Sequence, residues 1–149
     1  MDAIDIRILG LIQEDDSRPL AEVARIAGLS RTGCWHRIRR MEAEGVIHRR
    51  VALLDAARLG KGTTAFVTLK TQDKSDALLE RLRRAAAAMP QAVELHRVTG
   101  GDYLLKLRLP GVDAYDEVFR SLAALLPDCH ISATFSMDVI KDTTAIPLP

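Results

Sequence analysis

Cysteine is scarce in this chain, and its two cysteines, Cys34 and Cys129, lie far apart. A disulfide framework of the kind that staples small secreted domains is therefore excluded. Long hydrophobic runs are missing as well, since no segment approaches the ~18–20 apolar residues that a membrane span needs. Asp2 and Asp5 follow Met1 closely, so the chain does not begin with the basic and apolar stretches of a secretory signal. We expect a cytoplasmic protein that does not associate with membranes.

Net charge is also almost absent, because the 149 residues sum to +1 at pH 7. Such a balance excludes a protein that binds a polyanion with its whole surface, but it allows a local basic patch. Residues 30–50 hold six arginines and two glutamates, a local charge of +4, which leaves −3 for the rest of the chain. A concentration of this kind is typical of a docking surface for a negatively charged partner.

Sequence signatures of catalysis are lacking too. The chain contains no G-x-S-x-G, Walker A or H-E-x-x-H motif and no paired cysteines at metal-ligand spacing. Cys34 and His36 are two residues apart and point to different sides of a helix, so Cys34 is expected to be a small buried hydrophobe. His96 and Asp102 can meet across a hairpin, but the pair lacks a nucleophile. We expect no enzyme activity, no metal and no cofactor; a small enzyme or metabolite-binding domain is the weakest alternative.

The first third of the chain has the pattern of three short helices, over about residues 2–15, 19–27 and 31–44. Gly28 can end the second helix with a positive φ, Ser30 can cap the third, and Gly45 can stop it. Three helices with a short Gly-Leu-Ser turn before the last are typical of a helix-turn-helix. The residues that follow, 46–55, resemble a strand.

Winding the third helix at about 100° per residue separates a core-facing stripe, Cys34, Ile38 and Met41, from an exposed face. Small residues near the start of that face and arginines toward its end suit a helix that enters the major groove. The candidate DNA-binding residues are Arg31, Thr32 and His36 for base edges, Arg37, Arg39 and Arg40 for phosphates, and Arg49 and Arg50, with His48, as a short wing on the backbone. The alternative is a solvated face on which the arginines pair with Glu42 and Glu44.

Trp35 lies on the flank of this helix, between the core stripe and the exposed face. Its type and position allow two interpretations. The preferred one packs the ring against the first helix at the edge of the core, and the other lays it along a DNA backbone.

The remainder of the chain has the order strand, helix, strand, strand, helix, strand. We place the first domain at residues 1–54, a glycine-containing linker at 55–62 and the second domain at 63–149. Right-handed crossovers turn this order into a four-stranded antiparallel sheet with both helices on one face, the ferredoxin-like βαββαβ arrangement. The fold class is therefore α+β, a winged helix-turn-helix followed by a ferredoxin-like domain.

Two segments of the second domain carry further expectations. The clearest period-two alternation runs over residues 131–139 and predicts the last strand. The face of the sheet without helices, to which we assign Ala65, Phe66 and Leu104, needs a cover. A second copy of the chain is the simplest cover, so we expect a homodimer through the sheet.

Several motifs in fixed order resemble one known family over essentially the whole chain. They are "DxxDxxIL" at Asp2, Asp5, Ile8 and Leu9, "GLS" followed by Cys34 and "RIRRMEAEGVI", "VTGGDYLLK", and the ending "VIKDTTAIPL". The sequence resembles the leucine-responsive and asparagine-regulator (Lrp/AsnC, feast-or-famine) family of bacterial and archaeal transcription factors. The resemblance implies an N-terminal helix-turn-helix that binds double-stranded DNA and a C-terminal effector and oligomerisation domain. It also implies dimers through the sheet, which often assemble into octamers.

The resemblance further implies an amino acid or similar small effector bound at the interface of C-terminal domains, at the turn between the second and third strands. By position the effector-binding residues are Thr99, Gly100, Gly101, Asp102 and Tyr103. Glycine N–H groups suit a carboxylate, and the Asp102 carboxylate suits an ammonium group. Two alternatives stay open: the glycines and aspartate form an ordinary tight hairpin, and the protein is an effector-independent or architectural regulator of the same fold.

Overall fold

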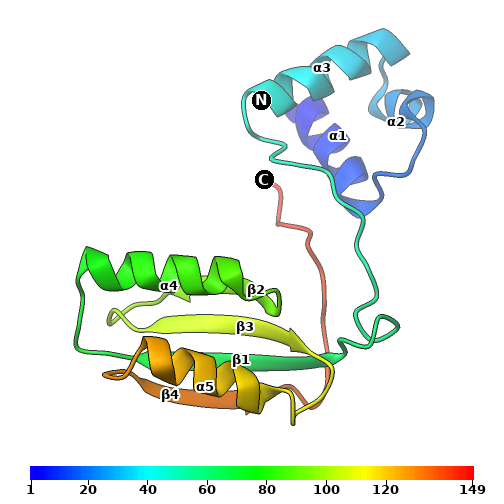
Figure 1. Cartoon of the computed structure of the whole chain (residues 1–149). Helices are drawn as coiled ribbons and strands as arrows, with labels where there is room; N and C mark the ends of the chain where they lie inside the picture. Colours follow the sequence, from blue (N-terminus) through cyan, green and yellow to red (C-terminus); the bar gives the residue numbers. More distant parts are fainter. The chain divides into compact units, whose positions relative to one another are not determined.

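The computed structural model describes all residues from 1 to 149, and their internal contacts divide them into two units. The first unit comprises residues 1–53 together with 141–149, and the second comprises residues 54–140. Figure 1 labels their helices and strands. None of the helices is both long enough and apolar enough to cross a membrane.

Three helices build the first unit: α1 (Ala3–Glu14), α2 (Leu20–Ala27) and α3 (Arg31–Ala43). Their ends follow the predicted signals. Gly28 ends α2 with a φ of 73°, and the Ser30 hydroxyl accepts a hydrogen bond from the Gly33 N–H at 3.1 Å. The helices enclose a small apolar core made of Ile8, Leu9, Val23, Ala24, Ala27, Cys34, Ile38 and Met41. The predicted stripe of α3 is therefore confirmed, and Cys34 is fully buried in it.

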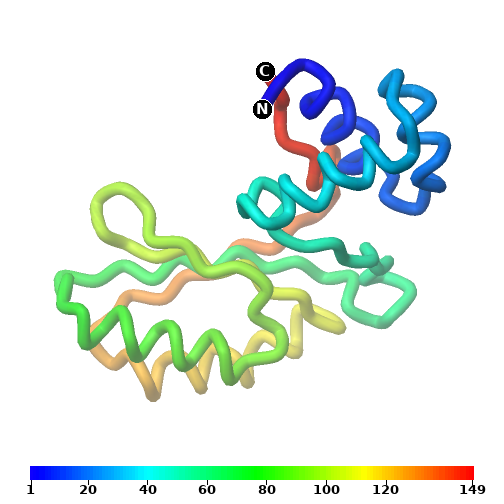
Figure 2. The backbone as a smooth tube through the Cα atoms, turned by 90° about the horizontal axis from the view of Figure 1, so that it is seen from above, coloured from blue at the N-terminus to red at the C-terminus, as the bar shows by residue number.

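The end of the chain packs with the first unit, so the predicted second domain, 63–149, extends too far. The side-chain amide of Gln13 donates to the Ile146 carbonyl and accepts from the Ile146 N–H, both at 3.2 Å. Leu148 packs against the helical core. Figure 2 shows this segment running beside α1. The assignment failed because a glutamine amide that pairs with a distant backbone leaves no periodic pattern in the sequence.

Residues 46–53 form no strand, which corrects the prediction of strand material at 46–55. A strand needs a partner for its N–H and C=O groups, and the sheet contains only four strands, all from the second unit. Val51 and Leu53 are accordingly exposed rather than half-buried. The wing predicted at His48, Arg49 and Arg50 is an irregular, exposed segment.

The second unit contains the predicted ferredoxin-like order of elements. They are β1 (Thr63–Lys70), α4 (Asp76–Ala88), β2 (Ala92–Arg97), β3 (Tyr103–Leu109), α5 (Tyr115–Leu125) and β4 (His130–Phe135). The strand order is β2-β3-β1-β4, and every neighbouring pair is antiparallel. Both helices lie on one face of the sheet (Figure 2). The predicted linker at 55–62 falls inside this unit, where Asp55 accepts hydrogen bonds from the N–H groups of Ala57 and Arg58.

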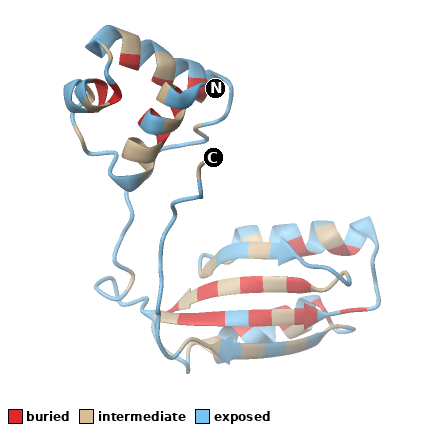
Figure 3. Cartoon of the chain, turned by 180° about the vertical axis from the view of Figure 1, so that it is seen from behind, coloured by how far each residue is buried: buried red, intermediate tan, exposed pale blue.

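Alternation along β3 decides which side chains meet the helices. Tyr103, Leu105, Leu107 and Leu109 are buried, and the residues between them are half-exposed. In Figure 3 the two central strands, β1 and β3, are the most buried of the sheet. Ala65 pairs with Leu107 and is fully buried in this core, so its predicted place on the opposite face was wrong.

The last strand is shorter than its alternation suggested. The prediction ran to Val139, but β4 ends at Phe135, opposite Ala65 near the start of β1. The Ser136 N–H still donates to the Thr64 carbonyl at 2.9 Å, and then the partner strand ends. Met137 is fully exposed as a result.

Candidate nucleic-acid interface and effector turn

The exposed face of α3 presents the predicted base-reading residues. Arg31, Thr32 and His36 are all exposed, because Cys34, Ile38 and Met41 hold the opposite side against the core. Arg31 is the first residue of α3 and forms no ion pair with any acidic group of the chain. Its guanidinium therefore keeps all of its donors for another molecule.

Arg39 is also exposed, but it contacts Glu42 one turn along the helix, with Nη1 3.0 Å from Oε2. A surface pair of this kind contributes about 0.2–1 kcal/mol. Arg39 can therefore exchange Glu42 for a phosphate at little cost.

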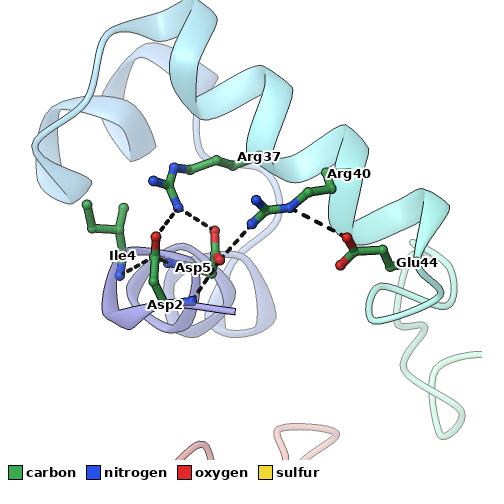
Figure 4. Close-up of polar contacts among 6 residues, drawn as sticks. All are labelled: Asp2, Ile4, Asp5, Arg37, Arg40 and Glu44. Atoms are coloured by element: carbon green, nitrogen blue, oxygen red, sulfur yellow. Dashed lines mark hydrogen bonds and ion pairs between the residues drawn. The ribbon is translucent and has the colours of Figure 1, made fainter.

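Arg37 points toward α1 instead of away from the domain (Figure 4). Its Nη1 lies 2.7 Å from an Asp2 carboxylate oxygen and 2.8 Å from an Asp5 oxygen. Arg40 reaches the other Asp5 oxygen with Nη2 at 2.7 Å, and its Nε lies 3.8 Å from Glu44. Two arginines that sequence reasoning assigned to phosphates are thus tied to the start of α1, although Arg40 stays about half exposed.

Asp5 is the centre of this network and is almost completely buried. Besides both arginines it accepts the Asp2 N–H at 2.9 Å, while Asp2 accepts the Asp5 N–H, so the two close a capping box on α1. Burial raises the pKa of Asp5, but the hydrogen bonds from the Asp2 N–H and Arg37 and the charge of Arg40 outweigh it, and the pKa is lowered. The hydrogen bond from Arg37 lowers the pKa of Asp2 to about 2. Both carboxylates are therefore ionised at neutral pH and fix α1 against α3.

The basic residues after α3 divide in the same way. Arg50 lies 3.3 Å from Asp16 and 3.5 Å from Glu42, so acidic groups of its own unit surround it. Arg49 is exposed and has no ion pair. Of the two arginines predicted to contact the DNA backbone, only Arg49 has a guanidinium that is not paired with a carboxylate.

Trp35 does not pack in the core, and its preferred interpretation was therefore wrong. Its side chain is 46% exposed. The His36 ring meets it edge-on with 4.9 Å between ring centroids, and the Arg39 guanidinium lies 5.7 Å from its centroid. The ring thus sits among residues that were predicted to contact DNA.

The predicted effector residues lie together at the turn between β2 and β3. The Gly101 N–H donates to the Val98 carbonyl at 3.0 Å, and the Val98 N–H donates to the Asp102 carbonyl at 2.9 Å. Gly100 and Gly101 have φ values of 89° and 82°, which residues with a Cβ rarely adopt. The Gly101 N–H is therefore committed to the turn, while the Gly100 N–H forms no backbone hydrogen bond.

Lys74 and Thr71, which sequence reasoning missed, lie beside this turn. The Thr71 N–H donates to the Asp102 carboxylate at 3.4 Å, and the Lys74 ammonium lies 3.8 Å from the same oxygen. Lys74 crosses directly over Gly101, since a Cβ there would come within 2.8 Å of it. The pairing of Leu69 with Tyr103 brings the residues after β1 to the turn before β3, a long-range contact that no local pattern in the sequence indicates.

Tyr103 is the deepest of the predicted effector residues. Its side chain is buried, and its hydroxyl has no hydrogen-bond partner in the chain. A buried polar group without a hydrogen-bond partner lowers the stability of the fold by about 1–3 kcal/mol. The presence of the hydroxyl at this position therefore calls for an explanation other than stability.

The face of the sheet away from the helices mixes apolar and charged side chains. Phe66, 38% exposed, and the half-buried Leu104 are its central apolar residues. Beside them Glu94 accepts from Lys106 at 2.7 Å and contacts His96 at 3.1 Å. The hydrogen bond from Lys106, with that from His96, lowers the pKa of Glu94. Both helices of the second unit lie on the opposite face, and ion pairs order the charged side chains of this one.

A helix-turn-helix with an exposed donor-rich third helix, joined to a ferredoxin-like unit, defines a class of two-domain DNA-binding regulators. Family models match both parts: residues 1–48 match the winged helix-turn-helix DNA-binding model, and residues 64–146 match the Lrp/AsnC ligand-binding domain. The chain belongs to the Lrp/AsnC family and is a DNA-binding transcriptional regulator.

Relatives and solved structures cover nearly the full length. The glutamate uptake regulatory protein of Zymomonas mobilis is 39% identical over 100% of this chain and 92% of its own. The transcriptional activator DecR of Escherichia coli is 35% identical over 99% of both chains. The crystal structure of an AsnC family regulator from Agrobacterium tumefaciens aligns with a TM-score of 0.92 and 40% identity, over 99% of this chain and 97% of that one. A Neisseria meningitidis regulator, solved as a complex with L-methionine, aligns with a TM-score of 0.88 and 26% identity, over 99% and 96%.

Proposed function

We propose that the exposed face of α3 reads base edges with Arg31, Thr32 and His36 and that Arg39 and Arg49 hold phosphates. The unpaired Arg31 at the start of the helix is the observation that carries this assignment. The first residues of a recognition helix are those that reach base edges in helix-turn-helix proteins. Carboxylates of their own unit hold the other basic residues, which stabilise the domain rather than contact DNA: Arg37, Arg40 and Arg50.

Arg39→Ala is expected to weaken binding equally on specific and random duplexes, because a phosphate contact carries no sequence information. Because a dimer loses this contact in both half-sites, the slope of log K against log salt concentration should become shallower by about 1.8, the contribution of two phosphates. Fluorescence anisotropy titrations at several salt concentrations measure both quantities.

Arg58→Ala is the matched control for Arg39. Arg58 is an exposed arginine of the second unit that pairs with Asp55, so its removal changes the net charge equally. It should leave the slope unchanged. Equal slopes for the Arg39 variant and the unmodified protein would contradict the phosphate assignment.

For the second unit we propose an amino-acid effector site at Thr99, Gly100, Gly101, Asp102 and Tyr103. The buried, unpaired Tyr103 hydroxyl supports a polar ligand here, because a ligand atom would supply the missing partner. Lys74, next to Asp102, places a cation where a ligand carboxylate would lie. The L-methionine complex of the Neisseria relative supports the class of ligand.

Tyr103→Phe separates the effector-binding and effector-independent alternatives. A thermal-shift screen of the common amino acids, run with and without DNA, should identify a ligand of the unmodified protein, since binding at 100 times the Kd adds about 2.7 kcal/mol to stability. The variant without ligand should be no less stable, because it loses only an unpaired hydroxyl. With ligand its shift should be at least halved.

Tyr115→Phe controls for the loss of a tyrosine hydroxyl elsewhere in the unit, and it should keep the full shift. A screen that is flat for the unmodified protein under both conditions would support the effector-independent regulator. An undiminished shift in the Tyr103 variant would exclude the hydroxyl from the site.

We further propose that the protein works as a homodimer through the bare sheet face, where Phe66 and Leu104 would be covered, and that dimers can associate into octamers. Two copies would place two α3 helices on half-sites spaced by a helical turn or a multiple of it. The protein acts by binding rather than catalysis, in the cytoplasm where bacterial and archaeal chromosomes lie.

A further inference from the structure

We infer that Trp35 is a specificity-determining residue that contacts thymine methyl groups in the major groove and holds Arg39 in place. This inference rests on the proposed use of α3 for DNA recognition. It assigns a contact to a residue whose type suggested the core.

The geometry of α3 places Trp35 inside the interface. Arg31, Trp35 and Arg39 follow one another at intervals of four residues, so they form a single ridge along the helix. The ridge from Arg31 to Arg39 rises about 12 Å, which is close to the width of the major groove. A helix that brings both arginines to DNA also brings the ring between them to the base edges.

The neighbours of the ring give it a defined position. The Arg39 guanidinium lies 5.7 Å from its centroid, close enough for a cation–π interaction. The His36 ring meets it edge-on at 4.9 Å. Trp35 is thereby fixed between two predicted DNA contacts while 46% of its surface stays open to solvent.

The chemistry of the exposed ring selects one feature of the groove. An apolar surface in the major groove discriminates thymine by its 5-methyl group, which no other base presents there. Aromatic residues make up only 4% of this chain, and its single tryptophan lies on an exposed face of a helix. Burial of the ring against a methyl group would remove that exposed apolar surface from water.

The single tryptophan makes the test direct, because all tryptophan fluorescence comes from Trp35. Emission and acrylamide quenching are measured as the full-length protein is titrated with a duplex selected from a random pool, while anisotropy of the labelled duplex reports binding. We expect the quenching constant to fall at least twofold at saturation.

Duplexes with uracil in place of individual thymines remove single methyl groups. At one or more positions the unmodified protein should lose about threefold to tenfold in affinity. Trp35→Ala should bind the selected duplex at least tenfold more weakly than the unmodified protein and should be insensitive to uracil. Trp35→Phe, which keeps an apolar ring, should recover part of the discrimination, and circular dichroism verifies that both variants fold.

Several results would overturn the inference. If anisotropy reports binding while the quenching constant stays unchanged, Trp35 does not contact DNA although the proposed function stands. The same holds if uracil costs nothing at any thymine. A quenching constant that changes with protein concentration alone would place the ring in a contact between copies of the chain. If no duplex binds, the proposed function fails, and this inference fails with it.

Discussion

Replacement of Asp5 by asparagine is expected to lower the free energy of unfolding of the first unit by about 2–3 kcal/mol at pH 7. The loss of one partner from a fully buried ion pair costs about 3–5 kcal/mol. We expect a smaller cost here because Arg37 and Arg40 are partly exposed, so their guanidinium groups can be hydrated when the carboxylate is lost. Asp5 is the buried member that both Arg37 and Arg40 reach across from α3. Denaturant unfolding followed by the fluorescence of Trp35, which lies in this unit, measures the change.

The same carboxylates give the stability a defined pH dependence. The pKa values of Asp2, about 2, and Asp5 are lowered in the folded state. Their contribution is therefore fully present above the ordinary pKa of about 4, and it is lost as the pH falls through the lowered pKa values of the folded state. The Asp5→Asn variant should lose less stability than the unmodified protein between pH 5 and pH 2.5.

Asp116→Asn is the matched control for Asp5. Asp116 pairs with Arg120 on the exposed side of α5, so the same change of charge should cost under about 1 kcal/mol. An Asp5 variant that is no less stable than this control would contradict the structural role of the network.

Replacement of Arg31 by alanine is expected to relax sequence preference at one base pair of each half-site. An arginine that binds a guanine edge with two hydrogen bonds contributes about 1–3 kcal/mol of discrimination, or about fivefold to 150-fold in affinity, at each half-site. Affinity of the dimer for the preferred site should therefore fall by about 30-fold or more. Affinity for random DNA should change far less. Competition titrations against duplexes that differ at single positions measure the preference.

Arg31→Lys separates geometry from charge. Lysine keeps the positive charge but lacks the planar fork that makes two parallel hydrogen bonds. It should preserve the salt dependence and still lose much of the discrimination. If Arg31→Ala and Arg31→Lys both keep the original preference, α3 meets DNA with another part of its surface.

Local signals predicted much of the fold, because they depend on neighbours in sequence. The cap at Ser30 and the positive φ at Gly28 depend on a single turn of chain, and the core stripe of α3 depends on the periodicity of one helix. The alternation of β3 likewise needs only one buried face. These features were visible in the sequence alone.

Features that depend on distant partners were not visible. The alternation beyond Phe135 continues in the sequence, but β1 offers nothing further to pair with. Residues 46–53 have strand-like composition without a neighbouring strand in this chain. The Gln13–Ile146 contact joins residues more than a hundred positions apart, and it moves the end of the chain into the first unit.

The candidate site shows the same division. Helical winding identified the outward residues and allowed the pairs that Arg39 and Arg40 form with Glu42 and Glu44. It did not predict pairs with carboxylates of the neighbouring helix. Arg37 lies on the flank, where only knowledge of Asp5 in the neighbouring helix reveals a buried carboxylate within reach. Trp35 was misassigned because residue type was weighed above its spacing from Arg31 and Arg39.

The most direct measurement of the central claim is selection of bound sequences from a random duplex pool by the full-length protein. The account predicts enrichment of a pseudo-palindromic site with two inverted half-sites, separated by a helical turn or a multiple of it. The same selection with the Arg31→Ala variant should lose preference at one symmetric pair of positions. A pool that shows no enriched sequence after several rounds would contradict the claim that α3 reads DNA.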